Sequence, residues 1–144
     1  MKKLSLYIFL VLMWGGVSFS EDLSNVDINK LTKLNTEEII AALSDKKLNG
    51  YYQFSAEDIF DFEEIHESDG KYFTNTEKLG KVSGEWEARD NKLCYKIYIT
   101  SSKEADEEFD CGAFVYTKYD IVYYFFDIEK QYFYAKSTSS IDLN

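Results

Sequence analysis

Short stretches of alternating hydrophobic and polar residues follow one another from residue 50 almost to the end of the chain. In Lys81–Arg89, for example, Val82, Gly84, Trp86 and Ala88 fall on one face, and polar or charged side chains fall on the other. This period of two is typical of a strand with one buried face. Strands are expected at residues 50–54, 58–66, 71–74, 81–89, 92–100, 111–117, 121–126 and 131–136, with short polar turns between them.

About seven or eight such strands predict a mainly β fold, an antiparallel meander. It would close as a small lipocalin-like barrel or pack as a sandwich. The turn at Asp69-Gly70, between aromatic runs, is a strong hairpin signal. The chain has no proline to protect exposed edge strands, which favours closure.

One short N-terminal helix precedes the strands in this prediction. Asn35 is a suitable N-cap, and the two glutamates that follow Thr36 suit the positive end of the helix dipole. Ile39, Ile40 and Leu43 then recur at helical spacing. Asn49-Gly50 is expected to end this helical region.

The first twenty residues have a different pattern. Lys2 and Lys3 precede the apolar run Leu4–Met13, and Ser18 and Ser20 supply the small side chains that a signal peptidase recognises. This order favours a secretory signal peptide cleaved near Ser20. An uncleaved membrane anchor and a buried core helix are the alternatives, but the apolar run is shorter than the ~20 residues of a spanning helix.

We therefore divide the chain into a signal peptide at 1–20, a polar leader at 21–35 and a single β domain with its N-terminal helix at 36–144. The leader is expected to be loose or weakly helical. The mature protein is expected in the periplasm of a bacterium, or secreted from it. Apart from the signal peptide, no contact with the membrane is expected.

Composition narrows the functional classes. The 144 residues include 26 acidic and 16 basic side chains, for a formal net charge of −10, and cleavage after Ser20 removes two lysines and no acid. A nucleic-acid binder is not expected, because such a protein needs a basic face to neutralise phosphates. The hydrophobic fraction of 45% excludes a disordered acidic tail.

Two cysteines in an oxidising compartment favour a disulfide. Cys94 and Cys111 lie in neighbouring predicted strands, joined by the acidic loop Ser101–Asp110. If they face each other, the hairpin turn falls near Ser102-Lys103. A metal pair would need more ligands, and a redox pair is usually spaced C-x-x-C, so both alternatives are weaker.

The order of several motifs resembles a family of small exported proteobacterial proteins of unknown function. The motifs are Gly84-Glu85-Trp86, Leu93-Cys94-Tyr95, Asp110-Cys111 and Tyr123-Tyr124-Phe125-Phe126, with a Ser68-Asp69-Gly70 turn and Asn49-Gly50-Tyr51 upstream. The family has a tryptophan strand followed by a cysteine-bearing hairpin, and the resemblance covers roughly residues 36–136. It implies an exported β protein and supplies no catalytic residues.

Candidate catalytic groups are sparse. His66 lies among carboxylates and could act as a general base. No G-x-S-x-G motif accompanies it, and we expect a solvated histidine at a hairpin end. The acidic runs 58–64 and 104–108 could bind calcium weakly, but they lack EF-hand spacing and are expected to form solvated faces. We therefore predict no catalytic residue, metal or cofactor.

Aromatic side chains on the predicted strands offer a possible binding surface. It would comprise Trp86, Tyr95, Tyr116, Tyr123, Tyr124, Tyr132 and Tyr134. Tyrosine combines a large contact area with a polar tip, which suits recognition. The competing interpretation is a thick aromatic core with tyrosine hydroxyls reaching solvent.

Two functional classes remain. The first is a non-enzymatic periplasmic module that binds a small apolar or aromatic ligand, and a cavity lined by Tyr and Phe would favour it. The second is an acidic envelope protein that docks a basic partner, as lysozyme inhibitors do. A filled core with acids massed around the Ser101–Asp110 loop would favour the second.

Overall fold

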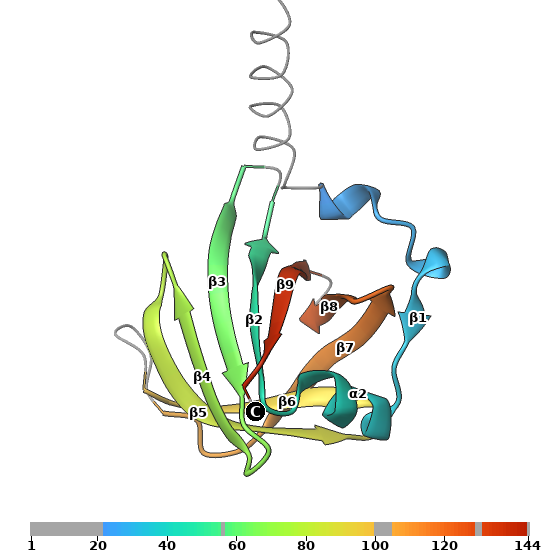
Figure 1. The fold of residues 1–144 in the computed structure, drawn as a ribbon. Helices are drawn as coiled ribbons and strands as arrows, with labels where there is room; N and C mark the ends of the chain where they lie inside the picture. Colours follow the sequence, from blue (N-terminus) through green and yellow to red (C-terminus); the bar gives the residue numbers. More distant parts are fainter. Residues whose placement is uncertain (1–21, 56, 100–104, 129–130, 144) are drawn as a thin grey trace, which may run out of the picture.

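Eight antiparallel strands close into a barrel, so the predicted mainly β meander is confirmed and the barrel is chosen over the sandwich (Figure 1). The computed structural model describes residues 22–55, 57–99, 105–128 and 131–143, and the expected signal peptide lies outside them. The barrel strands are β2 (Lys46–Gln53), β3 (Ile59–His66), β4 (Lys71–Thr76), β5 (Gly80–Arg89), β6 (Lys92–Ile99), β7 (Asp110–Lys118), β8 (Ile121–Ile128) and β9 (Gln131–Asp142).

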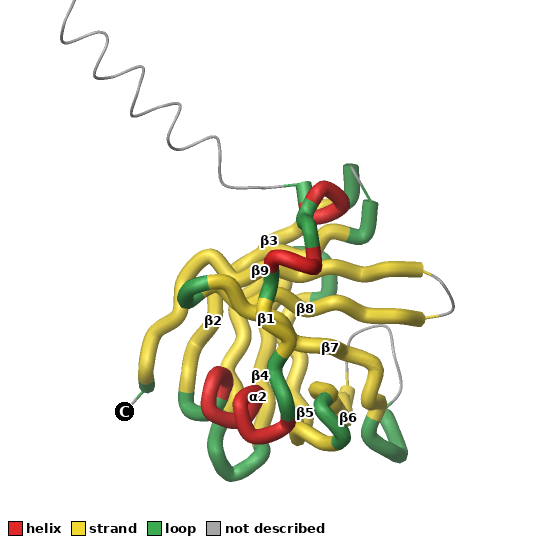
Figure 2. The backbone as a smooth tube through the Cα atoms, turned by 90° about the vertical axis from the view of Figure 1, so that its right-hand side faces the viewer, coloured by secondary structure: helices red, strands yellow, loops and turns green. Residues whose placement is uncertain are grey.

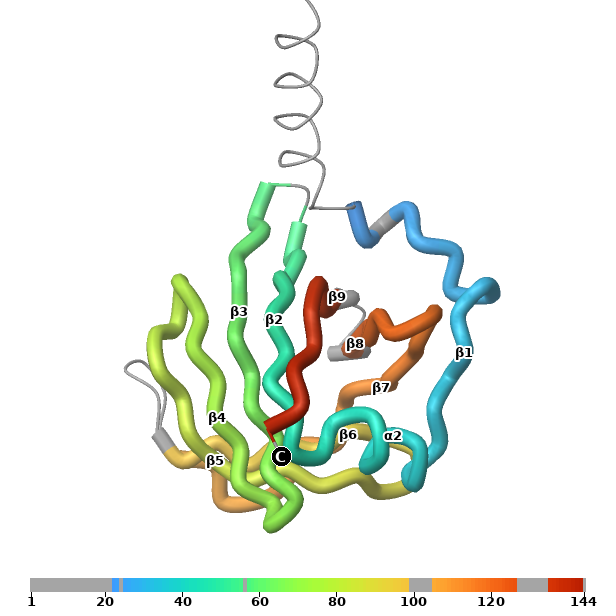
Figure 3. The backbone as a smooth tube through the Cα atoms, in the orientation of Figure 1, coloured from blue at the N-terminus to red at the C-terminus, as the bar shows by residue number. Residues whose placement is uncertain are grey.

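Each strand pairs with its neighbour in sequence, and β9 pairs with β2 to close the ring (Figure 3). A short strand β1 (Thr32–Lys33) pairs with the second half of β7, whereas β6 pairs with the first half. Closure satisfies the backbone hydrogen bonds of the strands without leaving a long open edge.

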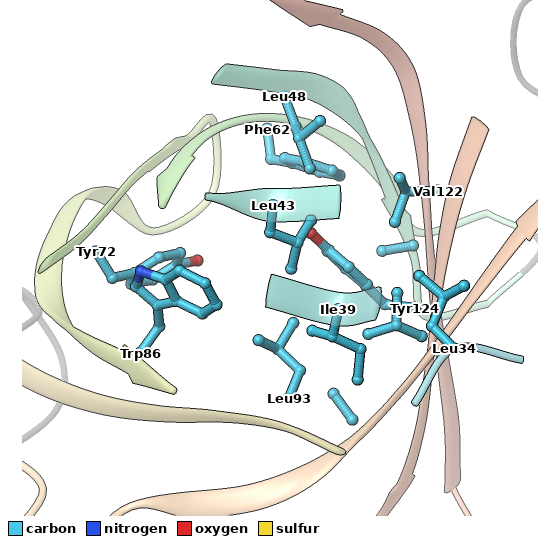
Figure 4. Close-up of a cluster of buried hydrophobic side chains, with 13 residues drawn as sticks. Leu34, Ile39, Leu43, Leu48, Phe62, Tyr72, Trp86, Leu93, Val122 and Tyr124 are labelled. Carbon is cyan, nitrogen blue, oxygen red and sulfur yellow. The ribbon is translucent and has the colours of Figure 1, made fainter. Parts of the chain in front are cut away.

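The helix α2 (Thr36–Leu43) lies at one end of the barrel (Figures 1 and 2). Its start is the predicted one. The Asn35 side chain accepts from the Glu38 N–H at 2.9 Å, and the Glu38 carboxylate accepts from the Asn35 N–H at 2.8 Å, which is a capping box. Ile39 and Leu43 are fully buried and pack among the barrel side chains (Figure 4). The helix thus closes this end with apolar side chains.

The predicted end of the helical region at Asn49-Gly50 is wrong. The helix ends at Leu43, and the chain turns at Asp45, whose φ is 55°. Gly50 lies inside β2, where a Cβ atom would come within 2.1 Å of the Lys136 carbonyl oxygen. The glycine is there because two strands approach closely at a register shift, and not to end a helix.

The polar leader, expected to be loose or weakly helical, does contain short helical turns, but it also packs against the barrel. It forms two 3₁₀ turns, η1 (Leu23–Asn25) and η2 (Ile28–Lys30), and then joins β1. Leu23 is only 2% exposed and packs with Tyr51, Tyr123 and Phe125 on the outer face of the strands. Figure 2 shows η1, η2 and β1 running along the outside of the strands. The outward aromatic face is therefore partly covered by the chain itself.

Within these described ranges, the structure contains no helix that is both long and apolar enough to cross a membrane.

Candidate functional site

The alternation of β3 carries two ionisable side chains into the barrel. Phe60, Phe62, Glu64 and His66 all face inward, and both Glu64 and His66 have an exposed fraction of 0%. The expectations of a solvated His66 and of a solvated acidic face including Glu64 are therefore wrong. Phe60 and Phe62 are an even number of residues away from Glu64 and His66, so all four side chains fall on the same face of the strand. Strict alternation from the two phenylalanines would therefore have predicted that Glu64 and His66 are buried.

Glu64 is held by tyrosine hydroxyls. Its Oε1 accepts hydrogen bonds from the hydroxyls of Tyr52 and Tyr72, the latter at 3.1 Å. Burial raises the pKa of Glu64 from 4.5 to about 7, although the hydrogen bonds from Tyr52 and Tyr72 act in the opposite direction. Burial also raises the pKa values of Tyr52, Tyr72 and Tyr124 well above 10, so these hydroxyls keep their protons.

His66 lies beside Glu64 in the same interior. Its Nε2 is 3.0 Å from the Tyr95 hydroxyl and 4.0 Å from Glu64 Oε2. Its ring also meets Trp86 edge-on, with the ring centroids 5.2 Å apart. Burial lowers the pKa of His66 to about 3, so the imidazole is neutral near pH 7 and the pair is not an ion pair.

Beside this polar cluster lies a cavity of about 220 Å³. It is lined by Tyr52, Tyr72, Leu93, Tyr95, Ile97, Asp106, Asp110, Gly112, Ala113 and Phe126. Tyr52 and Tyr72 are the donors to Glu64, and Tyr95 is the partner of His66. The cavity wall and the buried polar cluster are thus built from the same three tyrosines.

The cavity forms where β6 and β7 diverge. Within the described residues only two residue pairs join these strands, Leu93 with Ala113 and Tyr95 with Asp110, and a register shift separates them. Asp106 holds its loop to β6, because its carboxylate accepts from the Ile97 N–H at 2.9 Å and its own N–H donates to the Ile97 carbonyl at 2.7 Å. Asp110 is exposed, so the cavity reaches the surface beside it.

A second hollow, of about 260 Å³, lies on β3, β4 and β5. Outward side chains such as Glu63, Phe73 and Lys81 line it. It is the larger of the two, but no buried cluster of ionisable side chains adjoins it among the described residues. The barrel cavity is the better candidate because fixed rings and hydroxyls converge there.

The aromatic residues predicted as a binding surface do not share one surface. Trp86 and Tyr124 are buried in the main core (Figure 4). The Trp86 indole N–H donates to the Glu67 carbonyl at 2.8 Å. Tyr95 lines the cavity.

Tyr116 and Tyr123 instead belong to the outer aromatic cluster, with Leu23 of the N-terminal segment. The side chains of Tyr132 and Tyr134 lie outside the described residues. Among the predicted residues whose side chains are described, only Tyr95 therefore lines the cavity. Sequence reasoning missed Tyr52, Tyr72 and Phe126, although Phe126 follows the inward parity of Tyr124.

Cys94 and Cys111 form a disulfide, as predicted. Tyr95 pairs with Asp110 next to it, which agrees with the predicted facing of the two cysteines. A Glu87 oxygen and both sulfurs lie within 4.8 Å of one another. The sulfurs are bonded to each other, so they do not offer thiolate ligands to a metal ion.

Comparison with known proteins finds no matching family model, no matching curated protein and no matching solved structure.

Proposed function

We propose that this protein is a non-enzymatic binding module that holds a small apolar or aromatic ligand inside its barrel. The observation that carries the proposal is the cavity of about 220 Å³ with Tyr52, Tyr72, Tyr95 and Phe126 in its wall. A dry cavity of about 150 Å³ in another protein accommodates benzene, so this volume suits a ligand with one ring.

The surroundings of His66 support binding over catalysis. A general base needs a substrate proton within hydrogen-bond reach, and a nucleophile or water to activate. The contacts of His66 are instead a tyrosine hydroxyl, aromatic rings and a buried carboxyl group. In this proposal the His66 imidazole is a packed part of the barrel interior.

Location outside the cytoplasm belongs to the same proposal. The Cys94–Cys111 disulfide is compatible with an oxidising compartment. The order of charged, apolar and small residues before Glu21 supports export with cleavage near Ser20, as does the resemblance to small exported proteins. The intact mass of protein recovered from the periplasm should correspond to a chain that begins at Glu21. A full-length mass would contradict cleavage.

Ligand binding is tested with benzyl alcohol, a neutral one-ring probe, followed by nuclear magnetic resonance. We expect saturable shifts of the amide signals of Leu93 and Ala113, which line the cavity. Ala113→Leu fills part of the cavity and should abolish these shifts. Ala88→Leu is the matched control, since Ala88 packs against the same core without lining the cavity.

Thermal unfolding of both variants establishes that each remains folded. Unchanged binding by folded Ala113→Leu would contradict the proposed location of the ligand. The competing role, docking of a basic protein, rests on net charge alone, and no described contact favours it.

A further inference from the structure

We propose that the ligand of the barrel cavity is a small organic cation, such as a protonated arylalkylamine. This inference rests on the proposed function and specifies its ligand class. The described lining residues combine four aromatic rings with the carboxyl groups of Asp106 and Asp110, and no lysine or arginine is among them. A cation is attracted both to the faces of aromatic rings and to carboxylates.

None of the lysine–ring contacts found among the described residues involves a ring of the cavity. Among the described side chains, lysine amino groups lie over rings elsewhere, namely those of Phe54, Phe60, Phe114, Tyr119 and Tyr123. Lys78, for example, lies 5.5 Å from the ring centroid of Phe60. Among the described residues, the contacts between lysines and rings thus lie outside the cavity, and in this proposal the ligand supplies the positive charge within it.

Glu64 adds a carboxyl group behind the ring wall. Its Oε1 accepts from Tyr52 and Tyr72, whereas its Oε2 has no hydrogen-bond partner among the described atoms. Burial favours the protonated form of Glu64, and the neutral His66 beside it offers no charge that would favour the carboxylate. A cation in the cavity would favour the ionised form of Glu64, because electrostatic interactions are strong where water is excluded.

The tyrosine hydroxyls fit the same ligand. The hydroxyl protons of Tyr52 and Tyr72 are both donated to Glu64. Toward a ligand, these two hydroxyl oxygens can therefore only accept hydrogen bonds. An ammonium group is a donor with no acceptor, as the lysine side chain is. An anionic ligand would meet acceptors and carboxylates and would be repelled.

Three probes of similar size share one ring and differ in charge: benzylamine, benzyl alcohol and benzoate. Comparing them distinguishes the contribution of the ligand's charge to binding from that of its ring. Calorimetric titration should show benzylamine binding about tenfold more tightly than benzyl alcohol, and benzoate the most weakly. The preference for benzylamine should decrease as salt is added, because salt screens charges near the surface.

Two pairs of variants locate the cation. Asp110→Asn and Phe126→Leu should each reduce the benzylamine preference about threefold or more. Asp120→Asn and Phe125→Leu make the same substitutions outside the cavity and should leave it unchanged. Thermal unfolding establishes that all four variants are folded.

The outcomes separate this inference from the proposed function. If benzyl alcohol binds as tightly as benzylamine, the ligand class is wrong and the binding module stands. If none of the three probes binds, both proposals are overturned. If the preference persists unchanged in Asp110→Asn and Phe126→Leu, the cation is not held in this cavity.

Discussion

Glu64 and His66 are two ionisable residues enclosed in a barrel of aromatic side chains, and burial moves their pKa values in opposite directions. Burial favours the neutral form of each group, so the carboxyl group holds its proton more tightly and the imidazole loses its proton more readily. In the unfolded chain, between pH 4.5 and pH 6.5, the proton is on the histidine and the carboxylate is free. In the folded protein it is on the carboxyl group.

The two groups should therefore cancel in the pH dependence of stability. Both states hold one proton between pH 4.5 and pH 6.5, so the free energy of unfolding gains no slope from this pair. We expect the free energy of unfolding to depend on pH in this range when either Glu64 or His66 is replaced.

His66→Gln leaves Glu64 alone, whose pKa is raised on folding. The unfolding free energy should then fall as pH rises from 4.5 to about 7, by about 3 kcal/mol. Glu64→Gln leaves His66 alone, whose pKa is lowered on folding. The free energy should then fall as pH drops from 6.5 to about 3, by about 5 kcal/mol.

Urea unfolding at a series of pH values measures these slopes relative to the wild type. Glu63→Gln makes the same substitution on the outward neighbour, where Glu63 lies 3.1 Å from the Lys47 amino group, and controls for the loss of one carboxyl group. Parallel profiles for the wild type and both interior variants would contradict the burial of the pair.

At the scale of elements, two glycines set where the strands bend. Gly50 in β2 and Gly84 in β5 both adjoin register shifts, and a Cβ at either position would lie 2.1 Å from a backbone carbonyl oxygen on the neighbouring strand. Backbone cannot move away as a flexible side chain can. A glycine at each shift therefore allows the sheet to curve into a closed barrel.

Gly50→Ala and Gly84→Ala should each lower the free energy of unfolding by about 3 kcal/mol, since the added methyl group forces two strands apart. Gly112→Ala is the matched control, because its Cβ would meet only Asp110 Oδ1, at 3.6 Å. Chemical denaturation of the three variants measures the difference. Equal stabilities would show that the strand approach is not required for closure.

At the scale of the whole molecule, the barrel has a weak seam between β6 and β7. Two pairs of residues join these strands within the described part of the chain, and the Cys94–Cys111 disulfide lies between them. The covalent bond thus holds the barrel together at the place where the cavity separates its strands. It also closes a loop of 17 residues in the unfolded chain.

Reduction of this disulfide should destabilise the protein by about 3 kcal/mol, because the unfolded chain regains loop entropy. The melting temperature should fall by roughly 10 °C without loss of the β fold, as circular dichroism would record. The Cys94→Ala/Cys111→Ala double variant should melt at this lower temperature and should not respond to reductant. An unchanged melting temperature for wild-type protein with two free thiols would contradict this role.

The fold was largely predictable because its signals are local. Alternation along the strands, the Asp69-Gly70 turn and the Asn35 cap each depend on a few neighbouring residues. The error at Asn49-Gly50 and the unpredicted packing of the leader have one cause. A glycine needed for contact with a distant strand looks like a turn residue, and Leu23 in a polar segment shows no partner until the barrel is built.

The candidate site was less predictable because its residues come from five strands. Tyr52, Tyr72, Tyr95, Ala113 and Phe126 lie on β2, β4, β6, β7 and β8, and no local motif joins them. The parity of β3 did indicate that Glu64 and His66 face inward. The inward position of its two phenylalanines is a stronger indication for Glu64 than the general preference of acidic side chains for solvent.

The sequence by itself determined the mainly β class of fold, about seven or eight of its strands and the pairing of the two cysteines, because periodicity and spacing are properties of the chain. Only the tertiary structure decided which aromatic side chains meet in a cavity and which are covered by the N-terminal segment. It also decided that an acid and a histidine are buried together. Those outcomes depend on barrel closure and strand register, which bring distant residues into contact and exclude water from them.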